Sequence, residues 1–157
     1  MPINPDPEAY RFLYEQARFN LARQEAALDE LRTRTGILVA AATVVTSFLG
    51  QEAARDGWGL TGNLGLGAFV IVIGLWVYVL WPTYGWIFSN DVTVLREDYI
   101  ESEPPRSMQD TYAILADKHA CHIAGNESRL RWLYRAFRGG IILIAVEVVA
   151  LLYDLPA

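Results

Sequence analysis

Three stretches of the chain are apolar over lengths that approach the thickness of a bilayer. Residues 35–51 and 57–90 carry no charged side chain, and residues 139–153 carry only Glu147. A membrane-spanning helix needs about 20 mainly apolar residues. The sequence therefore predicts spans over 35–54, 64–88 and 138–156. The alternative is that these are buried helices of a soluble bundle, but the length of the uncharged middle stretch favours the membrane.

The polar segment before the first span is also patterned as a helix. Its apolar side chains recur at alternating spacings of four and three, with Gln24 as a polar interruption, which is typical of a helix packed along one seam. These positions are Tyr10, Tyr14, Ala17, Leu21, Leu28 and Leu31. Asp6 is a good N-cap residue, and Pro7 suits the first helical position. Since only Gly36 separates this helix, 7–35, from the first span, we expect one continuous helix.

The rest of the chain is expected to contain the second span, a connector and a second long helix that runs into the third span. Pro82 should kink the second span, because proline cannot donate to the carbonyl of Tyr78. A Gly-rich loop at 51–63 precedes that span, and a polar connector at 89–106 follows it. Ser107, with Asp110 three residues on, resembles a capping box. It predicts a helix over 107–138 that runs into the third span, with Gly139 and Gly140 at the membrane entry.

The expected fold is an all-α integral membrane protein, a single membrane domain over 1–157. It has three transmembrane helices and two long cytoplasmic helical extensions, and its first and third helices run parallel. Twelve of the thirteen basic residues lie before the first span or between the second and third, and Arg55 is the exception. The positive-inside rule places those segments, and the N-terminus, in the cytoplasm and the C-terminus outside. The polar start predicts no cleavable signal peptide.

Composition narrows the function classes. Apolar residues make up 53% of the chain and aromatic residues 12%, which excludes a disordered protein. Cys121 is the single cysteine, so there is no disulfide scaffold. The formal net charge of −5 argues against a nucleic-acid partner.

Each predicted span carries a stripe of small or polar residues at four/three spacing. The first-span stripe is Gly36, Ala40, Thr43, Ser47 and Gly50. The second-span stripe is Gly67, Ile71, Gly74, Tyr78, Trp81 and Gly85. The third-span stripe is Ala136, Gly140, Leu143, Glu147, Ala150 and Asp154. Small residues let membrane helices approach closely. The stripes therefore predict packing within one chain or self-association between copies.

Glu147 is the most informative single residue. It lies about 13 Å into the third span, counted from Arg138, where a carboxyl group is costly and should face protein or water. Thr43, Thr46 and Ser47 of the first span are its expected hydroxyl partners. Two hypotheses follow: a neutral hydrogen-bonded clamp between helices, or an ion- or proton-sensitive element of a pore. Both predict that Glu147→Leu changes oligomer size or abolishes activity.

Few residues outside the spans point to chemistry. His119, His122 and Asn126 are spaced to share one helix face, which predicts a polar layer in a helix seam or a pH-responsive pair. With Asp117 and Cys121 nearby, a metal site is an alternative, but one helix supplies too few ligands. No phosphate loop or nucleophile turn is present. We therefore expect no catalytic residue, metal or cofactor, and a protein that is not an enzyme.

The layout resembles the Pycsar effector transmembrane family and related small bacterial anti-phage membrane modules. The likeness rests on three segments: LDELRTRTGILVAAA entering the first span, VLWPTYGW ending the second, and NESRLRWLYRAFRGG entering the third. In that family, cyclic-nucleotide recognition triggers oligomers that disrupt the inner membrane. This chain lacks a separate nucleotide-binding domain and any assignable phosphate cradle. The resemblance thus implies the fold and membrane action, and no ligand-binding residue.

Two functions are expected from these observations. One is a homo-oligomeric membrane-perturbing or channel-like effector in the bacterial inner membrane. The other is a non-conducting membrane anchor whose cytoplasmic helices bind a partner protein. In both, the lipid bilayer is the first partner.

Overall fold

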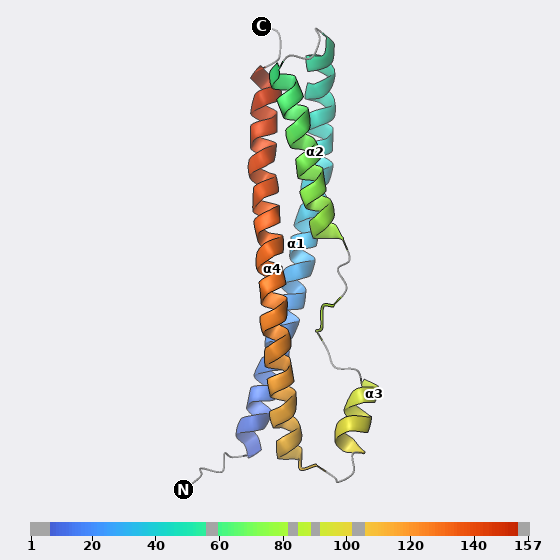
Figure 1. Cartoon of the computed structure of the whole chain (residues 1–157), viewed down its shortest axis with the longest axis vertical. Coiled ribbons are helices and arrows are strands. Elements are labelled where there is room, and N and C mark those ends of the chain that lie inside the picture. Colours follow the sequence, from blue (N-terminus) through green and yellow to red (C-terminus); the bar gives the residue numbers. More distant parts are fainter. Residues whose placement is uncertain (1–6, 56–59, 82–84, 89–91, 102–105, 154–157) are drawn as a thin grey trace. The chain divides into compact units, whose positions relative to one another are not determined.

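The computed structural model describes residues 7–55, 60–81, 85–88, 92–101 and 106–153. Within them the regular elements are all helical. They are α1 (Pro7–Arg55), α2 (Leu60–Leu80), α3 (Val92–Leu95), the π-helix η1 (Arg96–Ile100) and α4 (Met108–Tyr153). Figure 1 draws and labels the α-helices. The all-helical fold class is confirmed, and α1, α2 and α4 are each long and apolar enough to cross a membrane.

Both predicted long helices are continuous. Pro7 is the first residue of α1, as expected, while Asp6 lies outside the described residues. Ser107 caps α4 in both directions: the Asp110 N–H donates to Ser107 Oγ at 3.1 Å, and the Ser107 hydroxyl donates to Asp110 Oδ2 at 2.6 Å. Gly36 interrupts neither the hydrogen bonding nor the length of α1, and the glycine pair of α4 is likewise inside the helix.

The boundaries of the second span and its preceding loop were predicted wrongly. α1 continues to Arg55 and α2 begins at Leu60, so the loop expected at 51–63 is helical at both ends. α2 ends at Leu80 and not at 88, with a last bond from the Trp81 N–H to the Val77 carbonyl at 2.8 Å. A residue that precedes proline is disfavoured in the helical region, which explains a stop here. The kink expected at Pro82 lies outside the described residues.

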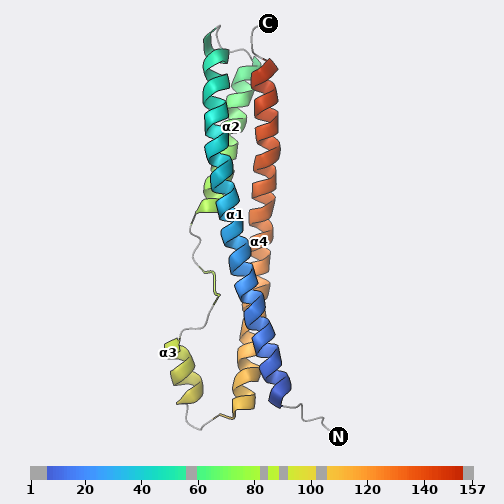
Figure 2. The same cartoon turned by 180° about the vertical axis from the view of Figure 1, so that it is seen from behind.

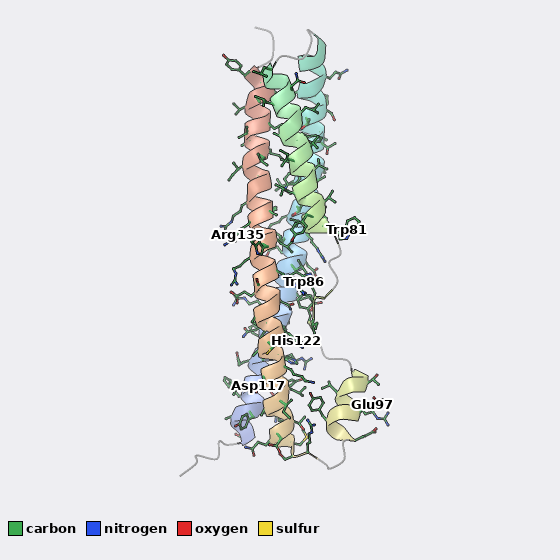
Figure 3. The ribbon with its side chains drawn as sticks, viewed as in Figure 1. Trp81, Trp86, Glu97, Asp117, His122 and Arg135 are labelled. Atoms are coloured by element: carbon green, nitrogen blue, oxygen red, sulfur yellow. The ribbon has the colours of Figure 1, made fainter. Side chains whose placement is uncertain are left out.

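Residues 85–88 are not helical and are bonded to α4 instead. Gly85 has φ +96°, a conformation that side chains disfavour, and its carbonyl accepts a hydrogen bond from Arg129. Asn126 Nδ2 donates to the Ile87 carbonyl at 3.0 Å. The Arg129 guanidinium lies 6.0 Å from the ring centre of Trp86, which Figure 3 labels. Two α4 side chains thus hold the chain that follows the second apolar helix.

The expected connector at 89–106 also contains regular structure. α3 and η1 place the apolar residues Leu95 and Tyr99 one helical turn apart. Tyr99 is buried, and two cations, Arg106 and Lys118, lie over its ring. The short spacing of these apolar residues is the local reason that the connector folds.

The chain divides into two compact units. Unit 1 comprises residues 1–28 and 83–130, and unit 2 comprises residues 29–82 and 131–157. In unit 1, the first part of α1 and the first part of α4 lie side by side and run in the same direction (Figures 1 and 2). The predicted seam of α1 is buried there at Ala17, Leu21 and Leu28, and α4 buries Leu115 with two residues of the predicted polar layer, His119 and Asn126.

Unit 2 is a bundle of three helices, formed by the later parts of α1 and α4 with α2, which both views show side by side. Its core is centred on Ala42, Val72 and Trp76, against which Leu38, Val39, Leu143 and Ile144 pack. Its outward surface is also apolar. Large exposed side chains there include Ile37, Val44, Phe48, Val70, Ile142 and Val149.

Candidate functional site

The buried carboxyl group of Glu147 is the centre of unit 2's polar chemistry. Its residue is only 1% exposed, and α4 points it at α1. The Thr46 hydroxyl donates a hydrogen bond to Glu147 Oε1. The second oxygen, Oε2, is buried and has no hydrogen-bond partner among the described residues. Only one of the two buried carboxyl oxygens therefore accepts a hydrogen bond from a described residue, and a buried polar atom without a partner lowers stability.

A cavity of about 130 Å³ adjoins this carboxyl group. Its lining comes from α1 and α4, and Thr46 and Glu147 are its polar members. The apolar remainder is Leu38, Ala41, Ala42, Val45, Ile144 and Val148. A water molecule occupies about 30 Å³ in the liquid and needs polar partners. The cavity is large enough for water beside the carboxyl group, and the arrangement can hold a proton or bridge two helices.

The structure brings only one of the three expected hydroxyls to Glu147. Thr46 meets it, whereas Thr43 donates to the Val39 carbonyl at 2.8 Å and Ser47 to the Thr43 carbonyl at 2.7 Å. Both of the latter side chains are exposed. Thr46 lies one helical turn beyond Ala42, a core residue, and so shares the inner face of α1. Because every face of this part of α1 is apolar, no pattern in the sequence separates Thr46 from its neighbours, and only the burial of Ala42 in the structure does so.

The three small-residue stripes differ in where they face. In the third-span stripe, Gly140 and Glu147 are buried, while Asp154 lies outside the described residues. A methyl group on Gly140 would overlap the indole of Trp76, so this glycine admits the largest core side chain. The Trp76 indole N–H is itself buried without a described partner. The third-span stripe therefore packs inside unit 2.

The first-span and second-span stripes face outward. A methyl group on Gly36, Gly50, Gly67 or Gly74 would meet nothing within 4 Å. Ala40 and the remaining second-span stripe residues within α2 are exposed. Packing in α2 instead uses Val72, Trp76 and Val79, which are fully buried. A methyl group added to Gly65 of α2 would lie 3.2 Å from the Leu151 side chain, so this glycine is in close contact with α4. The sequence pattern had not singled out Gly65 as a packing residue.

The histidine cluster lies in unit 1. His119 is buried and Asn126 is buried, whereas His122, labelled in Figure 3, is half-buried. The imidazole of His119 lies 5.4 Å from the Tyr14 ring, and its Nδ1 has no partner among the described residues. Burial lowers the pKa of His119 below its usual value; the Leu115 backbone opposes this in part, and the charges of His122 and Arg18 lower the pKa further. His119 is therefore favoured as a neutral side chain in the seam.

The described part of the chain contains no group of three or more His, Cys, Asp or Glu residues placed to hold a metal ion. Cys121 is exposed and free. Another polar contact in the same unit crosses the seam, where Gln24 Nε2 donates to the Ile123 carbonyl at 3.0 Å. The polar residues of unit 1 thus bridge helices rather than converge on one point.

The sequence matches no family model and no curated protein, and the structure matches no solved structure.

Proposed function

We propose that the chain is a homo-oligomeric three-span protein of the bacterial inner membrane that acts as a membrane-perturbing or channel-like effector in defence or signalling. The observation that carries this proposal is the outward direction of the first-span and second-span stripes. A methyl group added to any of the four stripe glycines within α1 and α2 would meet nothing within 4 Å, and two hydroxyl-bearing residues of the first-span stripe, Thr43 and Ser47, are exposed.

Self-association gives these stripes a role that lipid contact does not. Helices in a bilayer associate through close packing and polar contacts, because burial of apolar surface supplies no driving force there. Small residues allow that close approach, whereas lipid packs equally well against large side chains. Copies that meet along α1 and α2 would bring the Thr43 and Ser47 hydroxyls into the assembly, where they could line a path for water or ions.

Charge and aromatic residues support the proposed orientation, with a cytoplasmic N-terminus and an external C-terminus. Twelve of thirteen basic residues fall on the side assigned to the cytoplasm. Trp81 and Trp132 are about 60% exposed, as aromatic residues at a membrane interface are expected to be. Figure 3 shows Trp81 projecting away from the helices. The resemblance to the anti-phage modules supports the bacterial effector role.

The test is release of a trapped dye and flux of ions from liposomes that contain the purified protein. We expect leakage by the wild type and an oligomer in chemical cross-linking. Gly74→Leu should reduce both, because its side chain occupies the proposed contact. Val77→Leu is the matched control, since Val77 is exposed on the same helix outside the stripe. A monomer that leaves the liposomes tight would overturn the proposal.

Substitutions of Glu147 in the same assay distinguish the two hypotheses for its carboxyl group, a clamp between helices or an ion- or proton-sensitive element. Glu147→Gln keeps an acceptor for Thr46 but removes the titratable proton. A clamp predicts unchanged assembly and flux in Glu147→Gln, with loss in Glu147→Leu. A proton- or ion-sensitive element predicts altered flux in both.

A second candidate is a non-conducting membrane anchor whose cytoplasmic helices bind a partner protein. Its support is a pair of aromatic side chains on the polar part of α1, Phe12 and Phe19, which are 60% and 63% exposed. They lie seven residues apart and so share one face of the helix. This candidate predicts a protein that is harmless when expressed and that co-purifies with a partner through that face. Phe12→Ser with Phe19→Ser should abolish the co-purification.

A further inference from the structure

Unit 1 contains a cavity of about 360 Å³, which nothing in the proposed function uses. Three tyrosine rings form much of its wall, those of Tyr14 from α1, Tyr99 from η1 and Tyr112 from α4. Leu95 and Leu115 add apolar surface. The volume falls within the range of about 300–1,000 Å³ that is usual for small-molecule sites.

The cavity has a buried floor and an open edge. Tyr99 and Leu115 are each only 5% exposed, so they form its floor. Tyr14 and Tyr112 are half-buried, and their ring centres lie 5.6 Å apart at a tilt of 41°. Met108 and Arg106 are exposed and form the edge. A flat ring that enters would meet aromatic faces and edges on several sides, the geometry that aromatic pairs prefer.

Positive charge gathers at the same place. The Arg106 guanidinium lies 5.4 Å from the Tyr99 ring centre, and Lys118 Nζ lies 5.0 Å from it. Among the described residues, neither cation forms an ion pair. Thr111, in the first turn of α4, also lines the cavity, and the N-terminal end of a helix favours negative charge. The nearby carboxylate of Asp110 accepts the Ser107 hydroxyl.

We propose that this cavity binds a small planar aromatic oxyanion. The ring would lie among the three tyrosines, and its carboxylate or phosphate group would meet Arg106 and Lys118. The aromatic wall selects the flat ring, and the two cations over one tyrosine select the negative charge. This site is independent of the proposed membrane function, so either can fail without the other.

The probe is 2-naphthoate, titrated into the full-length protein in lipid nanodiscs and followed by ligand-observed NMR, with empty nanodiscs as the blank. A ligand of this size that gains modest energy per atom should bind with a Kd on the order of 1 mM or tighter. Neutral 2-naphthol, which lacks the charge, and octanoate, which lacks the ring, should each bind more weakly. Octanoate binding as tightly as 2-naphthoate would overturn the assignment of an aromatic ligand.

The double variant Arg106→Gln/Lys118→Gln tests the cationic part. Both side chains are exposed, so the fold should tolerate the change, and affinity should fall by about tenfold or more. Arg135→Gln is the matched control: like Lys118, Arg135 lies 5.0 Å over an aromatic ring without lining the cavity, but that ring is Trp132 and not the cavity residue Tyr99. Unchanged affinity in the double variant, or an equal loss in the control, would overturn the proposal. So would the absence of saturable binding by the wild type.

Tyr99 tests the aromatic part. Tyr99→Phe keeps the ring and should retain most of the affinity, whereas Tyr99→Leu should lose it. If Tyr99→Leu does not fold, the Arg106/Lys118 pair still decides the proposal. Retained affinity in a folded Tyr99→Leu protein would contradict it.

Discussion

The two units of this chain solve the problem of buried polar groups in different ways. In unit 1, amide side chains donate to backbone carbonyls of other segments, as Asn126 does to Ile87 and Gln24 does across the seam to Ile123. In unit 2, a single carboxyl group meets a single hydroxyl, and both the core and the outward surface are apolar. The exposed surface of unit 1 carries charged side chains such as those of Arg11 and Glu15, whereas the exposed surface of unit 2 is mainly apolar. The two parts of each long helix therefore differ in what their outer faces carry.

The largest expected loss of stability comes from a substitution that disturbs the close packing of Gly140 against Trp76 in unit 2. Gly140→Ala places a methyl group in the indole of Trp76 and should lower the free energy of unfolding by about 1–3 kcal/mol. Gly74→Ala is the control, because its methyl group meets nothing and the change favours helix. Denaturant unfolding of the protein in mixed micelles measures both. Equal effects of the two substitutions would show that the core of unit 2 is not packed as described.

Protonation of His119 should make the stability of unit 1 depend on pH. Burial lowers the pKa of His119 in the folded state, while the unfolded chain has a value near 6.5. The unfolded state then binds more protons, so the stability of unit 1 should fall as the pH drops below about 6.5. The slope for one proton is at most about 1.4 kcal/mol per pH unit.

The measurement is thermal unfolding between pH 7.5 and 5.5, read from a probe in unit 1. His119→Phe should flatten the profile, whereas His122→Gln should leave a pH dependence. A flat wild-type profile would mean that His119 does not titrate between the folded and unfolded states.

The hydrogen bond within unit 2 should contribute less. Thr46→Val removes the donor to Glu147 and should cost about 0.6–1.7 kcal/mol, the range found for such bonds between membrane helices. Thr43→Val removes a similar hydroxyl that bonds only to its own helix, and the loss should be near zero. The same micelle unfolding assay compares them. A larger cost for Thr43→Val would place Thr43, and not Thr46, at a contact.

Surface charge should contribute least. Arg11 and Glu15 form an exposed pair at 3.0 Å, one helical turn apart. Arg11→Gln should lower the stability of unit 1 only slightly, because both side chains of the pair are exposed to solvent, and added salt should remove the difference. Unfolding at low and high ionic strength measures this. An effect as large as that of Gly140→Ala would contradict the division between a polar surface and a buried core.

Local patterns in the sequence were sufficient for much of the fold. The heptad spacing from Tyr10 to Leu31 predicted the buried seam of α1, and Ser107 with Asp110 predicted the start of α4. The end of α2 was misjudged because the uncharged stretch continues past Pro82, and lack of charge does not by itself require a helix. Proline geometry was the stronger signal there.

The inward and outward faces of the spans could not be read from the same patterns. When every face of a helix is apolar, hydrophobic periodicity no longer marks the core, and α2 buries Val72, Trp76 and Val79 rather than its glycines. The cavity around Tyr99 was also missed. It depends on contacts between segments far apart in the chain, from Tyr14 to Tyr112, and no local spacing encodes them.

The bond between Thr46 and Glu147 has a consequence for the order in which the protein is made. The two residues are 101 positions apart, and Thr46 is synthesised first. At about 5–20 residues per second, it precedes Glu147 by several seconds. In a membrane, an acidic residue at the centre of a helix opposes insertion by about 2.5–3.5 kcal/mol. Under the proposed membrane topology, the earlier helix already presents its hydroxyl when the last helix leaves the ribosome, and so helps the least apolar part of that helix into the bilayer.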